Sequence, residues 1–298
     1  MAQAHILVGA GIDPAIPVVR RIRPADLLDA LAKGLNDFAA MPSHALFLCI
    51  IYPLAGIGLA ALTLGFATVP LLFPLAAGFA LVGPIAAIGL YELSRRREAG
   101  VDVAATDALD ALNSPSIGAI AAIGVLLLIL FAVWIGTARA IYVESFGYAT
   151  PTSISQFIHD VLFTPAGWTL IIVGNGVGLV FAAVAMTVSV VSFPLLLDRD
   201  VGAAVALMTS VRVVLANPLT MALWGLIVAA LLLIGSLPLF IGLAVVLPVL
   251  GHATWHLYRK AVEPDPNPRP DYRPQPREGR RYAADFPAVL LPWFKEDR

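Results

Sequence analysis

The sequence predicts an all-α membrane protein with six transmembrane helices in three hairpin repeats, accompanied by cytoplasmic amphipathic interfacial helices. Three observations support this fold class. The chain is 59% hydrophobic and only 13% charged, it contains several apolar segments of about 20 residues, and its basic residues lie on one side of those segments. A soluble domain is nearer ~45–50% apolar and ~25% charged. A soluble chain of this composition would therefore expose large apolar patches, which a membrane chain presents to lipid.

The basic residues predict the orientation of the chain. It has 19 Lys and Arg residues, and all except Arg139 fall in segments on the same side of the apolar segments. Positively charged loops stay in the cytoplasm during insertion. We therefore expect a multi-pass protein of the bacterial cytoplasmic membrane with both termini in the cytoplasm. Residues 139–165 form the one substantial external loop in this arrangement.

Six segments are apolar enough to cross the hydrocarbon core, which needs about 20 residues of helix. They are approximately 44–66, 68–92, 116–138, 166–193, 219–235 and 237–258. Very short turns join the first two spans and the last two, so each pair is a helical hairpin. The chain then divides into an N-terminal cytoplasmic tail (1–23), a six-helix membrane domain (24–262) and a Pro/Arg-rich cytoplasmic tail with an apolar end (263–298).

Three amphipathic segments each precede a proline and then a span. They cover residues 26–40, 103–113 and 200–216. In the first, the apolar residues follow helical spacing with polar residues on the other side: Leu27, Leu28, Leu31, Leu35 and Phe38. Amphipathic helices of this kind lie along a leaflet, and the proline begins the next helix. We expect all three on the cytoplasmic surface.

The ends of two hairpins match in sequence, which indicates an internal repeat. In each, an aromatic residue lies seven positions after a proline, and a basic pair follows at the same distance. The matching residues are Pro84, Tyr91, Arg95 and Arg96 in one hairpin and Pro248, Trp255, Arg259 and Lys260 in the other. The alternative is chance similarity among apolar segments of low complexity.

Aromatic and basic residues beside a span are typical of anchors at the lipid headgroups. The candidates are Tyr91, Arg95, Arg96, Arg97, Trp255, Arg259 and Lys260. A basic cluster beside a span also attracts anionic lipids. The alternative for the cluster around Glu92 is an ion-pair network that stabilises the end of the second span.

His252 and His256 are the candidate metal ligands. Four residues apart on a helix, they share one face, and two histidines at that spacing can hold a metal ion or haem. No glutamate follows in an HExxH arrangement, and no third ligand is evident in the sequence. The alternative is a pair of interfacial histidines that hydrogen-bond to headgroups or to a neighbouring helix. We expect no cofactor unless these two residues bind one.

Asn175 is a candidate intramembrane polar site, because it lies near the middle of the fourth span between two glycines. A carboxamide in lipid needs partners. It either lines a pore or a broken-helix site or hydrogen-bonds between helices.

The C-terminal tail ends in an apolar patch after a proline-rich, basic linker. We predict that this patch docks on a partner or returns to the bilayer, through Phe286, Leu290, Leu291, Trp293 and Phe294. The alternative is a disordered tail without a role, although disordered segments contain few aromatic residues.

Three motifs carry a resemblance to a known family: Gly83-Pro84 with 89–96, residues 192–200, and residues 248–259. Over about 24–262 the chain resembles a family of predicted bacterial integral membrane proteins of unknown function. Some members of that family carry the label cytochrome c oxidase subunit I. Such a subunit needs about twelve spans and about six buried histidine ligands, whereas this chain has 5 histidines in all. The resemblance therefore implies a fold and a location, and no mechanism.

The sequence contains no nucleotide-binding loop, nucleophile elbow, kinase signature or zinc-site spacing. The first function hypothesis is therefore a non-enzymatic scaffold, assembly or accessory component of a membrane complex, such as a respiratory one. The second is a transporter or channel for a small or lipid-like solute, and the third is haem or metal binding. The expected partners are the lipid bilayer, anionic lipid and another membrane protein complex, with no nucleic acid.

Overall fold

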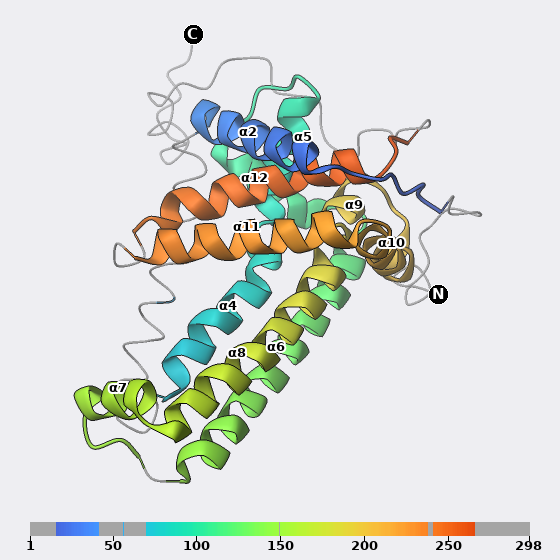
Figure 1. Cartoon of the computed structure of the whole chain (residues 1–298). Helices are drawn as coiled ribbons and strands as arrows, with labels where there is room; N and C mark the ends of the chain where they lie inside the picture. Colours follow the sequence, from blue (N-terminus) through green and yellow to red (C-terminus); the bar gives the residue numbers. More distant parts are fainter. Residues whose placement is uncertain (1–15, 42–55, 57–69, 149, 238–240, 266–298) are drawn as a thin grey trace, which may run out of the picture.

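The computed structural model describes residues 16–41, 56, 70–148, 150–237 and 241–265, and every regular element in these ranges is a helix. Figure 1 shows two parts. The first, which we call the stalk, consists of α4 (Leu72–Ala86), α6 (Ile117–Phe146) and α8 (Pro165–Ser189). The second crosses one end of the stalk. We call it the charged end.

The charged end contains most of the remaining helices. They are α2 (Pro24–Ala40), α5 (Ile88–Glu98), η2 (Ala105–Asn113, a 3₁₀ helix), α9 (Ser192–Asp198), α10 (Gly202–Ala216), α11 (Pro218–Ser236) and α12 (Leu243–Ala261). In Figure 1, α2, α12 and α11 lie side by side across the top of the stalk. The prediction of an all-helical protein is confirmed for the described residues.

Three helices in the described part of the chain are long and apolar enough to span a membrane. They are α6, the continuous stretch Pro165–Asp198 formed by α8 and α9, and α11. Only 17% of the α11 window is buried within the protein, so most of its apolar surface faces outward. These three helices correspond to predicted spans, but the prediction of six spans is not confirmed, and 44–66 lies outside the described residues apart from Gly56.

Two predicted spans form shorter helices than expected. The segment 68–92 divides at Ala87 into α4 and α5, just after Pro84, whose missing N–H interrupts the helical hydrogen bonds. The segment 237–258 forms α12, which begins only at Leu243. The second half of α12 carries two histidines and a basic pair. Its composition is therefore too polar for a span, and it lies among the helices of the charged end.

The three predicted amphipathic segments all form helices, namely α2, η2 and α10. The buried face of α2, however, differs from the predicted apolar stripe. Small residues and an aspartate are buried with Leu27, whereas Leu28 and Leu35 are 66% and 53% exposed. The three-hairpin repeat is not confirmed either, because α2, assigned to the first repeat, packs mainly on α12, the last helix of the third.

The predicted external loop 139–165 is mostly helical. Residues 139–146 continue α6, and α7 (Ile154–Phe163) follows at the end of the stalk farthest from the charged end. Ser153 caps α7 by accepting a hydrogen bond from the backbone of Gln156 at 3.1 Å. This capping serine explains why a helix begins there.

Residues 16–23 cross the charged end as an extended segment. Val19 pairs with Val262 in an antiparallel bridge, and the backbone N–H of Arg20 donates to the carbonyl of Ala261 at 2.8 Å. Asn217 accepts a hydrogen bond from the backbone N–H of Ile22 at 2.8 Å. The part of the predicted N-terminal tail that the structure describes is therefore held against the membrane domain.

Candidate functional site

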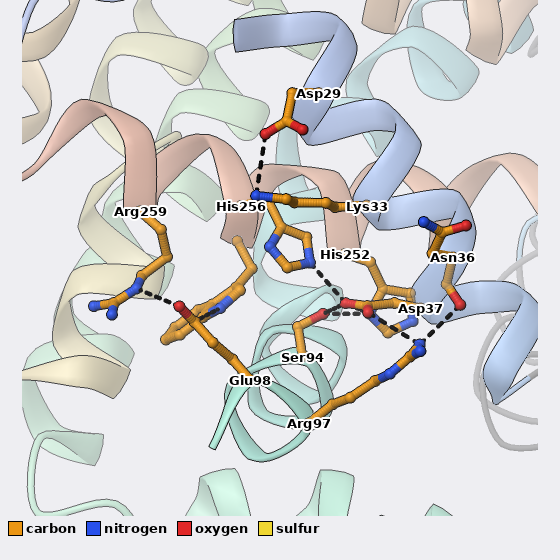
Figure 2. Close-up of polar contacts among 11 residues, drawn as sticks. Asp29, Lys33, Asn36, Asp37, Ser94, Arg97, Glu98, His252, His256 and Arg259 are labelled. Carbon is orange, nitrogen blue, oxygen red and sulfur yellow. Dashed lines mark hydrogen bonds and ion pairs between the residues drawn. The ribbon is translucent and has the colours of Figure 1, made fainter. Parts of the chain in front are cut away.

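The polar residues of the charged end converge on Asp37. Figure 2 shows side chains from α2, α5 and α12 pointing toward one another around this carboxylate. We call the group the Asp37 cluster; its members are Asp37, Ser94, Arg97, His252 and His256. The side chains of Ser94 and His252 have no exposed surface, and Asp37 is 6% exposed.

Small residues bring the helices of the cluster together. At Gly34 a side-chain Cβ would lie only 2.7 Å from the backbone nitrogen of Ala253 and from the carbonyl oxygen of Val249. The helices α2, which contains Gly34, and α12, which contains Val249 and Ala253, can approach this closely only because Gly34 has no side chain. Asp37 lies one turn farther along the same face of α2 and therefore points at α12.

Asp37, on α2, accepts hydrogen bonds from the other two helices, α5 and α12. One carboxylate oxygen, Oδ2, lies 2.6 Å from the hydroxyl of Ser94 and 2.8 Å from Nε2 of His256. The other oxygen, Oδ1, lies 3.1 Å from the guanidinium of Arg97, which also donates to the backbone carbonyl of Asn36 at 2.8 Å. The carboxylate therefore links α2 to α5 and α12 simultaneously.

His252 is the innermost member of the cluster. Its Nδ1 lies 2.7 Å from the hydroxyl oxygen of Ser94. Because Ser94 donates its single proton to Asp37, that oxygen accepts from Nδ1–H of His252, which places the imidazole proton on Nδ1. The other nitrogen, Nε2, is buried and has no hydrogen-bond partner among the described residues.

The environment shifts two pKa values of the cluster in ways that match this geometry. Burial alone raises the pKa of Asp37, but the hydrogen bonds from His256 and Ser94 outweigh it and hold that pKa below its ordinary value. Burial lowers the pKa of His252 to about 4, against the opposing attraction of Asp37. Near neutral pH the cluster therefore contains a carboxylate and a neutral His252.

A second group of charges surrounds Glu92, whose side chain is fully buried. It accepts hydrogen bonds from Arg95 at 3.0 Å and from Arg96 at 2.8 Å. Arg96 also pairs with Asp107 at 3.0 Å and Asp110 at 2.5 Å, both on η2. The predicted ion-pair network at Glu92 is therefore present, and it extends from α5 to η2.

A third group links the ends of α5, α9 and α12. Glu98 accepts a hydrogen bond from the indole of Trp255 at 2.8 Å and pairs with Arg259 at 3.0 Å. The hydroxyl of Tyr258 donates to Asp198 at 2.5 Å. On the α2 side, Lys260 pairs with Asp29 at 2.7 Å, and this contact, ahead of that with Lys33, lowers the pKa of Asp29.

The residues predicted as headgroup anchors therefore lie mainly inside the charged end. Tyr91 and Trp255 are 2% and 1% exposed. The basic residues have carboxylate partners, including Arg97 with Asp37 and Lys260 with Asp29. These contacts favour the alternative, an ion-pair network within the protein, while anchoring at lipid headgroups stays a prediction.

The histidine pair predicted from the sequence is brought together at Asp37. Nε2 of His256 lies 2.8 Å and Nδ1 of His252 lies 4.0 Å from the same carboxylate oxygen. The guanidinium of Arg97 already balances the charge of that carboxylate. Among the described residues, no three His, Cys, Asp or Glu side chains are arranged to hold a metal ion.

The contacts among Ser94, His252 and Asp37 are not those of a catalytic triad, in which an acid orients a base and the base activates a nucleophile. Asp37 contacts Ser94 itself rather than orienting His252 toward it, and Ser94 is fully buried. A serine nucleophile needs an accessible hydroxyl beside a base. The arrangement is suited to holding α2, α5 and α12 together by hydrogen bonds between their buried side chains.

Asn175 lies on the exposed face of α8 and points away from the protein. Its amide donates to the carbonyl of Ile171, one turn earlier in the same helix, at 2.7 Å. This position supports neither a pore nor a contact between helices within the described part of the chain. The apolar patch of the C-terminal tail, from Phe286 to Phe294, lies outside the described residues.

Sequence reasoning missed the central residues of the cluster, Asp37 and Ser94. The apolar stripe of the segment 26–40 predicts that Asp37, like the other polar residues of that segment, lies on the opposite side from the stripe. The signal that identifies it is the spacing of Ala30, Gly34 and Asp37, which puts the aspartate on a face of small residues. Such a face is the one that allows another helix to approach.

Comparison with known proteins identifies one family. Residues 72–198 match the family described as predicted integral membrane protein (DUF2189). This match confirms the resemblance to a family of integral membrane proteins of unknown function. It runs from the start of α4 to the end of α9, and therefore includes Ser94 and Glu92 but not α2 or α12. No curated protein and no solved structure matches the chain.

Proposed function

We propose that this integral membrane protein is a non-enzymatic scaffold, assembly or accessory component of a membrane complex, such as a respiratory one. We further propose that it resides in the bacterial cytoplasmic membrane with both termini in the cytoplasm. The observation that supports the accessory role is the contrast within the charged end. Its buried charges pair with one another, whereas leucines of α2 and η2 remain exposed.

The inner contacts make the charged end a fixed platform. Asp37 joins three helices, Glu92 joins α5 to η2 through Arg96, and Glu98 joins α5 to α12. Buried ionic contacts of this kind hold one arrangement of helices because any displacement leaves a charge unpaired. A platform of this kind can present a surface of constant shape to another protein.

The outer surface of the platform carries apolar residues that no described element covers. Leu28 and Leu35 of α2 are 66% and 53% exposed, and Leu109 and Leu112 of η2 are 59% and 65% exposed. Apolar patches rimmed by charged groups are typical of protein interfaces. We therefore place the partner contact on α2 and η2.

The test is purification from native membranes in a mild detergent, followed by mass spectrometry and an absorption spectrum of the same sample. The expected result is a stoichiometric partner protein. The double variant Leu28→Ala/Leu35→Ala should lose it. The matched control is Leu226→Ala/Leu233→Ala on α11, which removes leucines that are each 65% exposed and should retain it.

The same sample separates the two alternatives. A solitary, colourless protein would contradict the accessory role and favour the transporter hypothesis. A haem band or bound metal that disappears in His252→Ala/His256→Ala would favour the metal-binding hypothesis. A partner lost equally from both leucine variants would contradict the interface on α2.

A further inference from the structure

The helix α7 carries a line of large apolar residues that faces away from the protein. Ile154, Ile158 and Leu162 are 51%, 51% and 46% exposed, and their four-residue spacing places them on one face. The exposed residues Gln156 and His159 lie on a different side. No side chain of α7 is fully buried, so this amphipathic helix lies on the surface of the stalk.

The position of α7 relative to the stalk is fixed. Thr164 accepts a hydrogen bond from the backbone of Gly167 at 3.0 Å and donates to the carbonyl of Asp160 at 2.5 Å. A Cβ at Gly167 would overlap the carbonyl groups of Asp160 and Val161, so the turn between α7 and α8 closes only around glycine. On its inner side, Phe157 packs against Tyr142 of α6, with ring centroids 6.4 Å apart.

The depth of α7 follows from the helices beside it. The uninterrupted apolar part of α6, residues 117–138, covers about 22 residues or roughly 33 Å, close to the ~30 Å hydrocarbon core. Arg139 follows immediately and makes no ion pair with the described residues. Trp168, at the start of α8, is 54% exposed. Arg and Trp residues mark the headgroup level of a membrane helix, so α7 lies near that level.

We propose that α7 lies in the plane of the membrane interface, on the face opposite the charged end, with Ile154, Ile158 and Leu162 inserted among lipid acyl chains. The adjoining helix α8 also exposes large apolar residues near its start, Trp168 at 54% and Ile172 at 66%. Since α8 belongs to a candidate span, lipid is the occupant that both surfaces share. Partly inserted amphipathic helices have this pattern. The inference does not depend on the proposed accessory role.

The test compares two faces of α7 in the full-length protein. Single cysteines are introduced as Ile158→Cys or Gln156→Cys, with Cys49, the only native cysteine, replaced by alanine. Each is labelled with an environment-sensitive fluorophore and reconstituted into phosphatidylcholine vesicles with or without brominated acyl chains. The label at position 158 should be quenched by roughly half in brominated vesicles, and the label at 156 should change little.

Equal and weak quenching at both positions would overturn the proposal, since it would place α7 in water. A label at 158 that is insensitive to bromination would overturn it as well if the unlabelled Ile158→Cys protein, treated with a thiol-reactive cross-linker in the same vesicles, joins to another polypeptide. Leu162→Cys repeats the measurement one turn farther along the same line and should agree with position 158. Both labelled positions are exposed, and each variant is used only if it elutes from size exclusion like the unlabelled protein.

Discussion

The two ends of this molecule satisfy their polar side chains differently. In the stalk, Thr137, Asn175 and Thr187 each donate to a carbonyl one turn earlier in their own helix, at 2.7–2.8 Å. At the charged end, Asp37 and Ser94 bond to residues of other helices. Lipid offers no hydrogen bonds, so a polar side chain on a membrane helix turns to its own backbone. At the charged end, the polar and charged side chains are buried against other helices, and their hydrogen bonds therefore decide which helices pack together.

The packing of the stalk depends on shape. Its centre is Trp134, which stacks at a tilt on Phe181 with ring centroids 5.4 Å apart and donates to the carbonyl of Pro74 at 2.8 Å. Gly78 and Gly178 leave room for the indole. The comparison therefore predicts that substitutions at the charged end are costly when they change charge. Substitutions in the stalk, where the packing of apolar rings dominates, should cost less when the side chain changes only slightly in volume.

The largest effect is expected for Asp37→Asn. The amide leaves Arg97 and His256 without their carboxylate partner. Breaking a fully buried pair costs about 3–5 kcal/mol, and we expect the lower end of that range because the side chain of Arg97 is 38% exposed. We expect a clearly lower thermal midpoint in detergent, followed by circular dichroism. Asp102→Asn, at an exposed aspartate, is the matched control and should melt like the natural protein. If both variants melt alike, the Asp37 cluster does not hold the charged end together.

The pH dependence of stability should report on His252. Its pKa is about 4 in the folded protein, below the ordinary ~6.5. The unfolded chain therefore takes up a proton first as the pH falls. The stability that folding gains by keeping His252 neutral is fully present above about pH 6.5 and is lost as the pH falls toward 4. Of this free energy of unfolding, about 2 kcal/mol is lost between pH 6.5 and 5. Thermal midpoints measured from pH 7.5 to 5 should fall less steeply in His252→Asn than in the natural protein. Parallel slopes would show that His252 does not titrate in this way.

A moderate effect is expected for Gly34→Ala. The added Cβ would lie 2.7–2.8 Å from atoms of Val249 and Ala253, and overpacking of this kind costs about 1–3 kcal/mol. The matched control is Gly174→Ala on α8, where a Cβ meets no atom within 4 Å. Chemical denaturation in mixed micelles should separate the two variants. A neutral Gly34→Ala would mean that α2 and α12 can move apart.

The smallest effect is expected in the stalk, for Trp134→Phe. The smaller ring keeps most of the apolar contact with Phe181 but loses the hydrogen bond to Pro74, which is worth about 1 kcal/mol in a membrane protein. Trp168→Phe, at a tryptophan that is 54% exposed, is the control and should be neutral. A loss for Trp134→Phe as large as that for Asp37→Asn would remove the distinction between the two ends.

The sequence by itself determined the helical class, the membrane location and many of the element boundaries. Apolar runs and capping residues act locally, so α6, α8, α10 and α11 begin within about two residues of their predicted starts, an accuracy typical of local signals. The histidine pair was also identified from the sequence, because residues four apart on one helix share a face wherever that helix lies.

Only the tertiary structure decided which groups those histidines meet. The distance from Asp37 to His256 along the chain is more than 200 residues, and no local pattern joins them. The choice depends on the close approach of α2 and α12 at Gly34. The division of the segment 68–92 at Ala87 follows Pro84, and α7 begins at the cap Ser153, so both depend on single residues rather than on contacts between distant helices. Hydropathy averaged over a span does not contain that information.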